Sequence, residues 1–282
     1  MKIAVITDSA SNLSKEYTEK HDNLYVVPLM ISIDGKEYRD QVEISASEVY
    51  DLLDNHKIKT SLPALEDVEE AVKKIKDNGY THLVVINISS GLSGTYNSFR
   101  MTLEGLKDIE VLHYDTKTLA GGEGVIVQYA LELIERNTPF DQLRSLLDEL
   151  RYKDSMAFYT INTLKYLREG GRVGKVEGAL GSLLQIKPII TLDNKGVYIT
   201  LSKAIGFRRS LLKMKSILEE EYGDDLIDLT IHYGNDFELA EGLGEKLKTS
   251  LNVRNLEITR LTPVLGVHTG PEIIAYIARR IK

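Results

Sequence analysis

The chain has 282 residues, 43% of them hydrophobic and 27% charged, so it can bury a sizeable core and form roughly two domains. Its 42 acidic and 35 basic residues give a net charge of −7, which argues against a general nucleic-acid-binding protein, because such proteins neutralise phosphates with clustered basic residues. The chain has no cysteine, which excludes disulfides and thiolate metal ligands.

The first half of the chain alternates strand-like and helix-like segments. This alternation predicts a parallel sheet with helices on both faces, that is, a Rossmann-like α/β domain. The helix after Pro63 is expected to be capped by Ser61 or a neighbouring residue and to end at 78–79. Strands are predicted at 3–6, 24–33, 37–38, 83–88 and 109–114, and further helices at about 95–106 and 119–134.

The second half mixes strands and helices without regular alternation. We therefore predict an N-terminal α/β domain over 1–155 and a C-terminal α+β domain over 156–282, with the ligand site between them. Strands are predicted at 156–160, 186–192, 197–204, near 227–233 and near 254–261, and helices at 162–168, 178–184, near 208–222, near 236–249 and after Pro271.

Serines, threonines and glycines gather where predicted strands lead into helices, above all over 89–95 (SSGLSGT). In an open α/β sheet, ligands collect at the carboxyl ends of the strands. Ser93 and Thr95 are expected to start one helix, Ser61 another, and Thr269 to precede a third. Converging helix N-termini would bind a small anion such as a carboxylate or a phosphate without a lysine. The same residues could also serve as simple helix caps.

Other chemistries receive less support from the sequence. The segment 91–95 (GLSGT) has Thr95 where a nucleophile elbow needs glycine, yet a serine hydrolase using Ser93 and His268 remains an alternative, and a small-anion sensor is a third class. We find no P-loop, no G-x-G-x-x-G fingerprint and no metal-ligand spacing among the six histidines, so no cofactor or metal is expected. The N-terminal apolar run is too short for a signal peptide or a membrane span, so we expect a cytoplasmic protein without membrane insertion.

Over essentially its full length the chain resembles the DegV family of bacterial fatty-acid-binding proteins. Any one of the shared motifs is weak, but all of them in this order are a specific signal. The motifs are TDS at 7–9, KTSLP at 59–63, SSGLSGT at 89–95, TLKYLREGGR at 163–172, IKP at 186–188 and GVHTGP at 266–271.

This resemblance implies a non-enzymatic carrier that buries one long-chain fatty acid in a tunnel between its domains and presents it to a fatty acid kinase for acyl-phosphate formation and phospholipid synthesis. It has no catalytic residue of its own. Compared with kinase-coupled members, the chain has Ile205 and Phe207 near an expected arginine, and its arginines follow at 208 and 209. The ligand-binding residues implied by the resemblance are Thr60, Ser61, Ser93, Gly94, Thr95, Arg172, His268 and Thr269.

Overall fold

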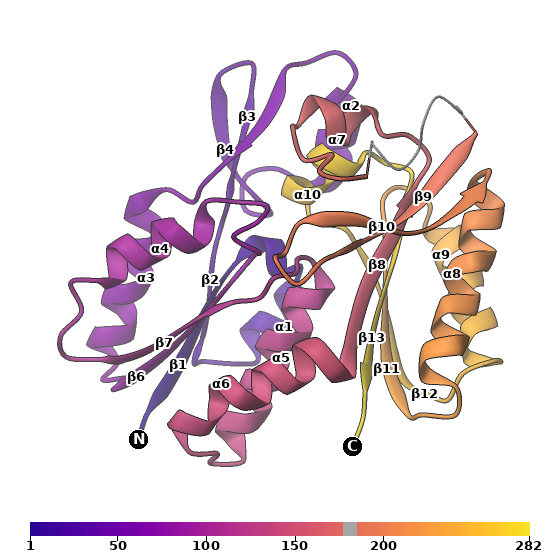
Figure 1. Cartoon of the computed structure of the whole chain (residues 1–282). Coiled ribbons are helices and arrows are strands. Elements are labelled where there is room, and N and C mark those ends of the chain that lie inside the picture. Colours follow the sequence, from indigo (N-terminus) through magenta and orange to yellow (C-terminus); the bar gives the residue numbers. More distant parts are fainter. Residues whose placement is uncertain (177–184) are drawn as a thin grey trace.

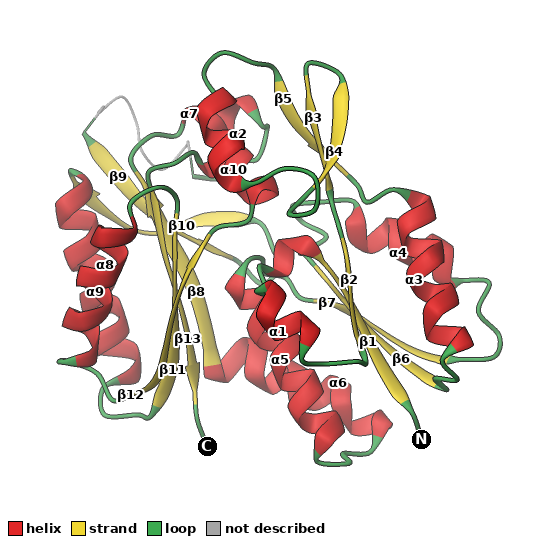
Figure 2. Cartoon of the chain, turned by 180° about the vertical axis from the view of Figure 1, so that it is seen from behind, coloured by secondary structure: helices red, strands yellow, loops and turns green. Residues whose placement is uncertain are grey.

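The computed structural model describes residues 1–176 and 185–282, and the helix predicted at 178–184 lies outside the described residues. Figures 1 and 2 show two β-sheets standing side by side, with helices between them and on the outer face of each. A small third sheet and several short helices lie at one end of the pair, at the top of Figure 1. None of the described helices is both long and apolar enough to cross a membrane.

The N-terminal sheet is fully parallel, with the strand order β2-β1-β6-β7. Its strands are β1 (Ile3–Asp8), β2 (Leu24–Val27), β6 (His82–Asn87) and β7 (Glu110–Asp115). The helices α3 (Leu65–Asp77) and α4 (Thr95–Leu103) cover one face, and α5 (Gly121–Glu135) covers the other. Because β1 and β6 are buried on both faces, each contains a continuous run of four apolar residues, at 3–6 and at 83–86. The predicted α/β architecture of this half is confirmed.

The small antiparallel sheet, in the order β4-β3-β5, differs from our expectation in two ways. The single strand predicted at 24–33 is divided at Pro28, which has no N–H to donate to a ladder. The segment carrying Thr60 and Ser61 forms a strand, so Ser61 does not cap a helix, and α3 begins after Ala64 without a side-chain cap. The elements here are β3 (Met30–Ile33), β4 (Lys36–Arg39), β5 (Ile58–Ser61) and α2 (Ala46–Leu52). Helix α1 (Lys15–Glu19) lies elsewhere, in contact with β2.

The C-terminal sheet is mixed, with the strand order β10-β9-β8-β13-β11-β12. Its central strand β13 (Ile273–Arg280) occupies the place where we predicted a final helix, which was wrong. A short, continuous apolar run such as 273–278 cannot be assigned to a helix or a strand by periodicity, and here it is buried between β8 and β11. The other strands of this sheet are β8 (Ser155–Ile161), β9 (Ile186–Leu192), β10 (Tyr198–Ile205), β11 (Ile227–Tyr233) and β12 (Val253–Arg260). The described α-helices not yet named are α6 (Phe140–Glu149), α7 (Lys165–Glu169), α8 (Phe207–Tyr222), α9 (Phe237–Lys248) and α10 (Pro263–Thr269).

Helix α5 joins the two sheets, because it packs against β1 and β6 on one side and against β8 and β13 on the other. At its first turn, the backbone N–H of Gly121 donates to Nε2 of the buried His232 on β11 (2.9 Å). Near its other end, both terminal nitrogens of Arg279 donate to the carboxylate of Glu132 at 2.6 Å. One continuous apolar core therefore spans both sheets. The domain boundary at residues 155/156 stays a prediction, although β8 begins at Ser155.

Candidate functional site

A cavity of about 230 Å³ lies where the small sheet, the turn before α4 and helix α10 meet. One part of its wall carries hydroxyl, imidazole and guanidinium groups, and the rest is apolar. The polar wall consists of Thr60, Ser61, Ser93, Gly94, Arg172 and His268, and the apolar wall of Leu29, Leu62, Ile88, Leu92, Leu119, Tyr198, Val264 and Leu265.

Two hydrogen-bonded pairs organise the polar wall. Thr60 Oγ1 and His268 Nε2 are 2.7 Å apart and share a hydrogen bond, which joins the end of β5 to α10. Ser93 Oγ and Thr95 Oγ1 share a second bond of 2.8 Å, and the Thr95 N–H also donates to Ser93 Oγ at 3.3 Å. Because Thr95 is fully buried and makes both of these hydrogen bonds to Ser93, it holds the Ser93 hydroxyl in place at the cavity wall.

His268 is held by its helix and by a glycine. The buried Asp40 accepts hydrogen bonds from Thr262 Oγ1 (2.6 Å) and from the Val264 N–H (2.9 Å), so it anchors the first turn of α10. Burial raises the pKa of Asp40 to about 6. A Cβ atom at Gly170 would lie 2.1 Å from His268 Nδ1, so only glycine leaves room for this ring.

His268 is uncharged at neutral pH. Burial, and secondly the positive charge of Arg172, lower the pKa of His268 to about 4. The cation of the polar wall is therefore Arg172, whose Nη1 donates to the backbone oxygen of Gly170 at 2.6 Å. Neutral donors beside one guanidinium can bind and hold an anionic group such as a carboxylate.

The structure brings most of the predicted site residues together. Thr60, Ser61, Ser93, Gly94, Arg172 and His268 line the cavity, and Thr95 lies directly behind Ser93. Thr269 does not line this cavity; it is the last residue of α10, and its hydroxyl donates to the Leu265 carbonyl (3.2 Å).

The expected convergence of several helix N-termini was wrong. Of the three expected helix starts, only the one at Ser93 and Thr95 lies at the cavity, where α4 begins. Ser61 ends a strand, and Thr269 ends a helix. Of the expected positive groups, the cavity thus has the N-terminus of α4 and the guanidinium of Arg172.

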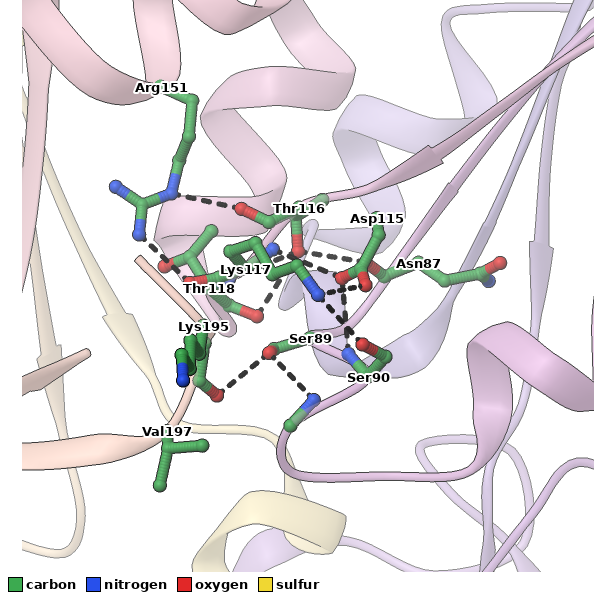
Figure 3. A network of polar contacts seen from close by, with 12 residues as sticks. Asn87, Ser89, Ser90, Asp115, Thr116, Lys117, Thr118, Arg151, Lys195 and Val197 are labelled. Atoms are coloured by element: carbon green, nitrogen blue, oxygen red, sulfur yellow. Dashed lines mark hydrogen bonds and ion pairs between the residues drawn. The ribbon is translucent and has the colours of Figure 1, made fainter. Parts of the chain in front are cut away.

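Ser89 and Ser90, at the start of the glycine-rich turn, serve a structural purpose. Neither residue lines the cavity. Figure 3 shows them in a polar network that fastens the turn between β9 and β10 onto the N-terminal sheet. Ser89 Oγ donates to the Gly196 carbonyl (2.8 Å), and Lys117 Nζ donates to Ser90 Oγ (2.9 Å) and to Asp115 (2.5 Å). This network holds the two sheets together beside the cavity.

A second pocket, almost entirely apolar, adjoins the first. The two pockets share the buried residues Leu119, Tyr198 and Leu265, which form the partition between them. Sequence reasoning missed these residues, because apolar cavity walls and ordinary core residues have the same composition. Further lining residues of this pocket include Ala157, Tyr159, Leu192, Leu261, Thr269, Ile273, Ala275 and Ile277.

The site has the geometry of a binding site more than that of a catalytic triad. A serine hydrolase needs the histidine bonded to the serine and oriented by an acid. Here His268 Nε2 bonds to Thr60, Ser93 bonds to Thr95, and the buried Nδ1 of His268 has no hydrogen-bond partner. Among residues 1–176 and 185–282, no cluster of side chains is suited to hold a metal ion.

The fold and the site together define an α/β protein with two large sheets, one small sheet and a cavity whose wall is partly polar and partly apolar. The family model described as "Uncharacterised protein, DegV family" matches residues 2–280, so the chain belongs to the DegV family.

Curated relatives with full-length similarity include a DegV domain-containing protein of Clostridium acetobutylicum, which is 39% identical over 98% of both chains. Another, from Staphylococcus aureus, is 33% identical over 98% of both chains. Among solved structures, a fatty-acid-binding DegV family protein of Thermus thermophilus superimposes with a TM-score of 0.91 at 28% identity, over 100% of both chains. A stearic-acid-binding protein of Eubacterium ventriosum gives 0.87 at 30% identity, over 99% of this chain and 98% of the other.

Proposed function

We propose that this protein binds one long-chain fatty acid between its two sheets. The observation that carries the proposal is the amphipathic cavity, in which hydroxyls, an imidazole and one guanidinium face a wall that continues into an apolar pocket. The carboxylate accepts hydrogen bonds from Thr60, Ser61 and Ser93 beside Arg172 and His268. The acyl tail extends past the partition into the apolar pocket.

The energetics of this arrangement divide between tail and head group. Each buried methylene contributes about 0.8 kcal/mol, so about ten of them give about 8 kcal/mol before the costs of association. The carboxylate adds little net affinity but loses its hydration shell, and it is tolerated only where donors replace the water. An ordinary carboxylate ionises near pH 4 to 5, whereas His268 stays neutral, so Arg172 supplies the compensating charge.

The named ligands of similar proteins support the proposal. The Thermus thermophilus relative is a fatty-acid-binding protein, and that of Eubacterium ventriosum binds stearic acid. A short anion would leave the apolar pocket without a ligand, which disfavours the small-anion sensor.

The direct experiment is mass spectrometry of lipid extracted from the purified, denatured protein. About one long-chain fatty acid per chain supports the proposal. A protein that carries no lipid and takes up no added fatty acid would overturn it and favour the hydrolase or the small-anion sensor. An irreversible serine-directed probe distinguishes a hydrolase from a carrier, because a hydrolase would be labelled at Ser93 and a carrier would stay unlabelled.

We further propose that the protein is a non-enzymatic cytoplasmic carrier, without a cofactor, that presents its acid to a fatty acid kinase. The exposed Arg208 and Arg209, in the first turn of α8, are the arginines available near the position where kinase-coupled members are expected to carry one. The test combines the loaded protein, ATP and a fatty acid kinase, and measures acyl phosphate. Acyl phosphate that forms only when the loaded protein, ATP and the kinase are all present supports a kinase as the partner. If no acyl phosphate forms while the fatty acid stays bound, the kinase partnership is refuted and the proposed lipid binding still stands.

A further inference from the structure

We propose that the far end of the apolar pocket, formed by Ala157 and Ile277, sets the length of the acyl chain that this protein accepts. The inference rests on the proposed fatty-acid binding and deepens it. Three observations carry it: the volumes of the two pockets, the register of the strands that wall the second one, and the helix that closes its end.

The first cavity is too small for a whole long-chain acid. A cavity of about 150 Å³ holds benzene, which corresponds to about 25 Å³ per carbon. The first cavity, of about 230 Å³, therefore holds about nine carbons. An acid of about 16 to 18 carbons needs roughly 400 to 450 Å³. Its tail must displace Leu119, Tyr198 and Leu265, which line both pockets, and enlarge the second pocket, which has about 30 Å³.

The second pocket has three levels along strands β8 and β13. Ile273 pairs with Ile161 at the level next to α10, Ala275 pairs with Tyr159 in the middle, and Ile277 pairs with Ala157 at the far level. Strands advance about 3.3 Å per residue, so successive levels are about 6.6 Å apart. Since α10 carries His268, the tail passes these levels in this order as it leaves the head group.

The first turn of α5 closes the far level. A Cβ atom at Gly122 would lie 3.0 Å from Ala157 Cβ, and a Cβ atom at Gly121 would lie 3.2 Å from Ile277 Cδ1. The helix backbone is thus already in contact with this end of the pocket, and α5 is itself fixed by the bond between Gly121 and His232. The tail cannot lengthen in this direction without moving the helix, so side-chain size at the far level determines where the chain ends.

The test changes the size of one side chain at each level and measures the lipid profile. Ala157→Leu adds three carbons at the far level, so the most abundant bound acid becomes shorter by about three carbons. Ala275→Leu adds the same group about 6.6 Å nearer the head, which removes about five more carbons at about 1.2 Å per bonded atom. Ile277→Ala has the opposite effect and lengthens the preferred acid by about three carbons. Ala157→Val and Ala275→Val serve as milder versions if a leucine variant does not fold.

The readout is the profile of acids retained from an equimolar mixture of saturated acids, from dodecanoic to eicosanoic. Ala71→Leu is the matched control, because Ala71 packs on the outer face of the N-terminal sheet, away from both pockets. The profile of acids bound by this variant should equal that of the wild type. Graded shifts in both directions support the inference. Unchanged profiles in variants that still bind acid overturn it and leave the proposed function standing, whereas a wild type that binds no acid overturns both.

Discussion

Replacing Ser93 by alanine tests whether this hydroxyl binds the carboxylate. Ser93 Oγ accepts a hydrogen bond from the Thr95 N–H and shares another with the Thr95 hydroxyl. When the Thr95 hydroxyl donates this shared bond, the Ser93 proton is available to a ligand in the cavity. A hydrogen bond to a charged group contributes about 1.5 to 3 kcal/mol, and one between neutral groups about 0.5 to 1.5 kcal/mol. The S93A variant should therefore lose about 10- to 150-fold in affinity for a fatty acid.

A long-chain alcohol of the same length provides the internal comparison. It buries the same tail but offers a neutral head group, so S93A should weaken its binding only about 2- to 13-fold. Both affinities can be measured by displacement of a fluorescent fatty-acid analogue. The matched control is Ser98→Ala, further along α4 and outside the residues that line the cavity. Equal losses for acid and alcohol, or no loss for the acid, would refute the assignment of Ser93 to the carboxylate.

Three further predictions concern glycine and histidine positions. Gly170→Ala should displace the His268 ring and weaken fatty-acid binding at least several-fold in the same displacement assay, because the new Cβ would lie 2.1 Å from Nδ1; an unaltered affinity would contradict this account. Gly196→Ala should destabilise the fold by about 1 to 3 kcal/mol in urea unfolding, since Gly196 has a φ of 72° and a Cβ there would meet Ser89 Oγ at 1.9 Å; Gly105→Ala, in open space, serves as the control. Burial lowers the pKa of His232 from 6.5 to about 4. As the pH falls, the imidazole is therefore protonated in the unfolded chain before it is protonated in the folded protein. The stability that the neutral imidazole gives the fold is lost as the pH falls from about 6.5 towards 4. The difference in free energy of unfolding between the wild type and His232→Gln should shrink by up to about 3 kcal/mol over that range. A constant difference would show that His232 is not the source of the pH dependence.

Much of the N-terminal half was predictable because its signals are local. Apolar runs in β1 and β6, with amphipathic helices between them, identify a parallel sheet from its sequence. The Ser/Gly turn before α4 was recognised because glycine and hydroxyl residues between an apolar run and an amphipathic segment indicate a turn from a strand into a helix. The strand β5 was missed, since its four residues alternate too briefly for a period to be detected.

By itself, the sequence identified hydroxyl-rich turns at Ser61 and Ser93 as candidates for binding an anion, and the resemblance to the DegV family added Thr60, Arg172 and His268. Only the tertiary structure decided how they meet: Thr60 and His268 are 208 positions apart and become neighbours because β5 and α10 pack together. It also decided that the residues after Pro271 form a central strand and that the apolar pocket lies beside them. The physical reason is that periodicity and turn chemistry act over a few residues, whereas a cavity is formed where segments distant in the chain leave space between them. The side chains around such a space are as apolar as the core, so their sequence does not distinguish them from it.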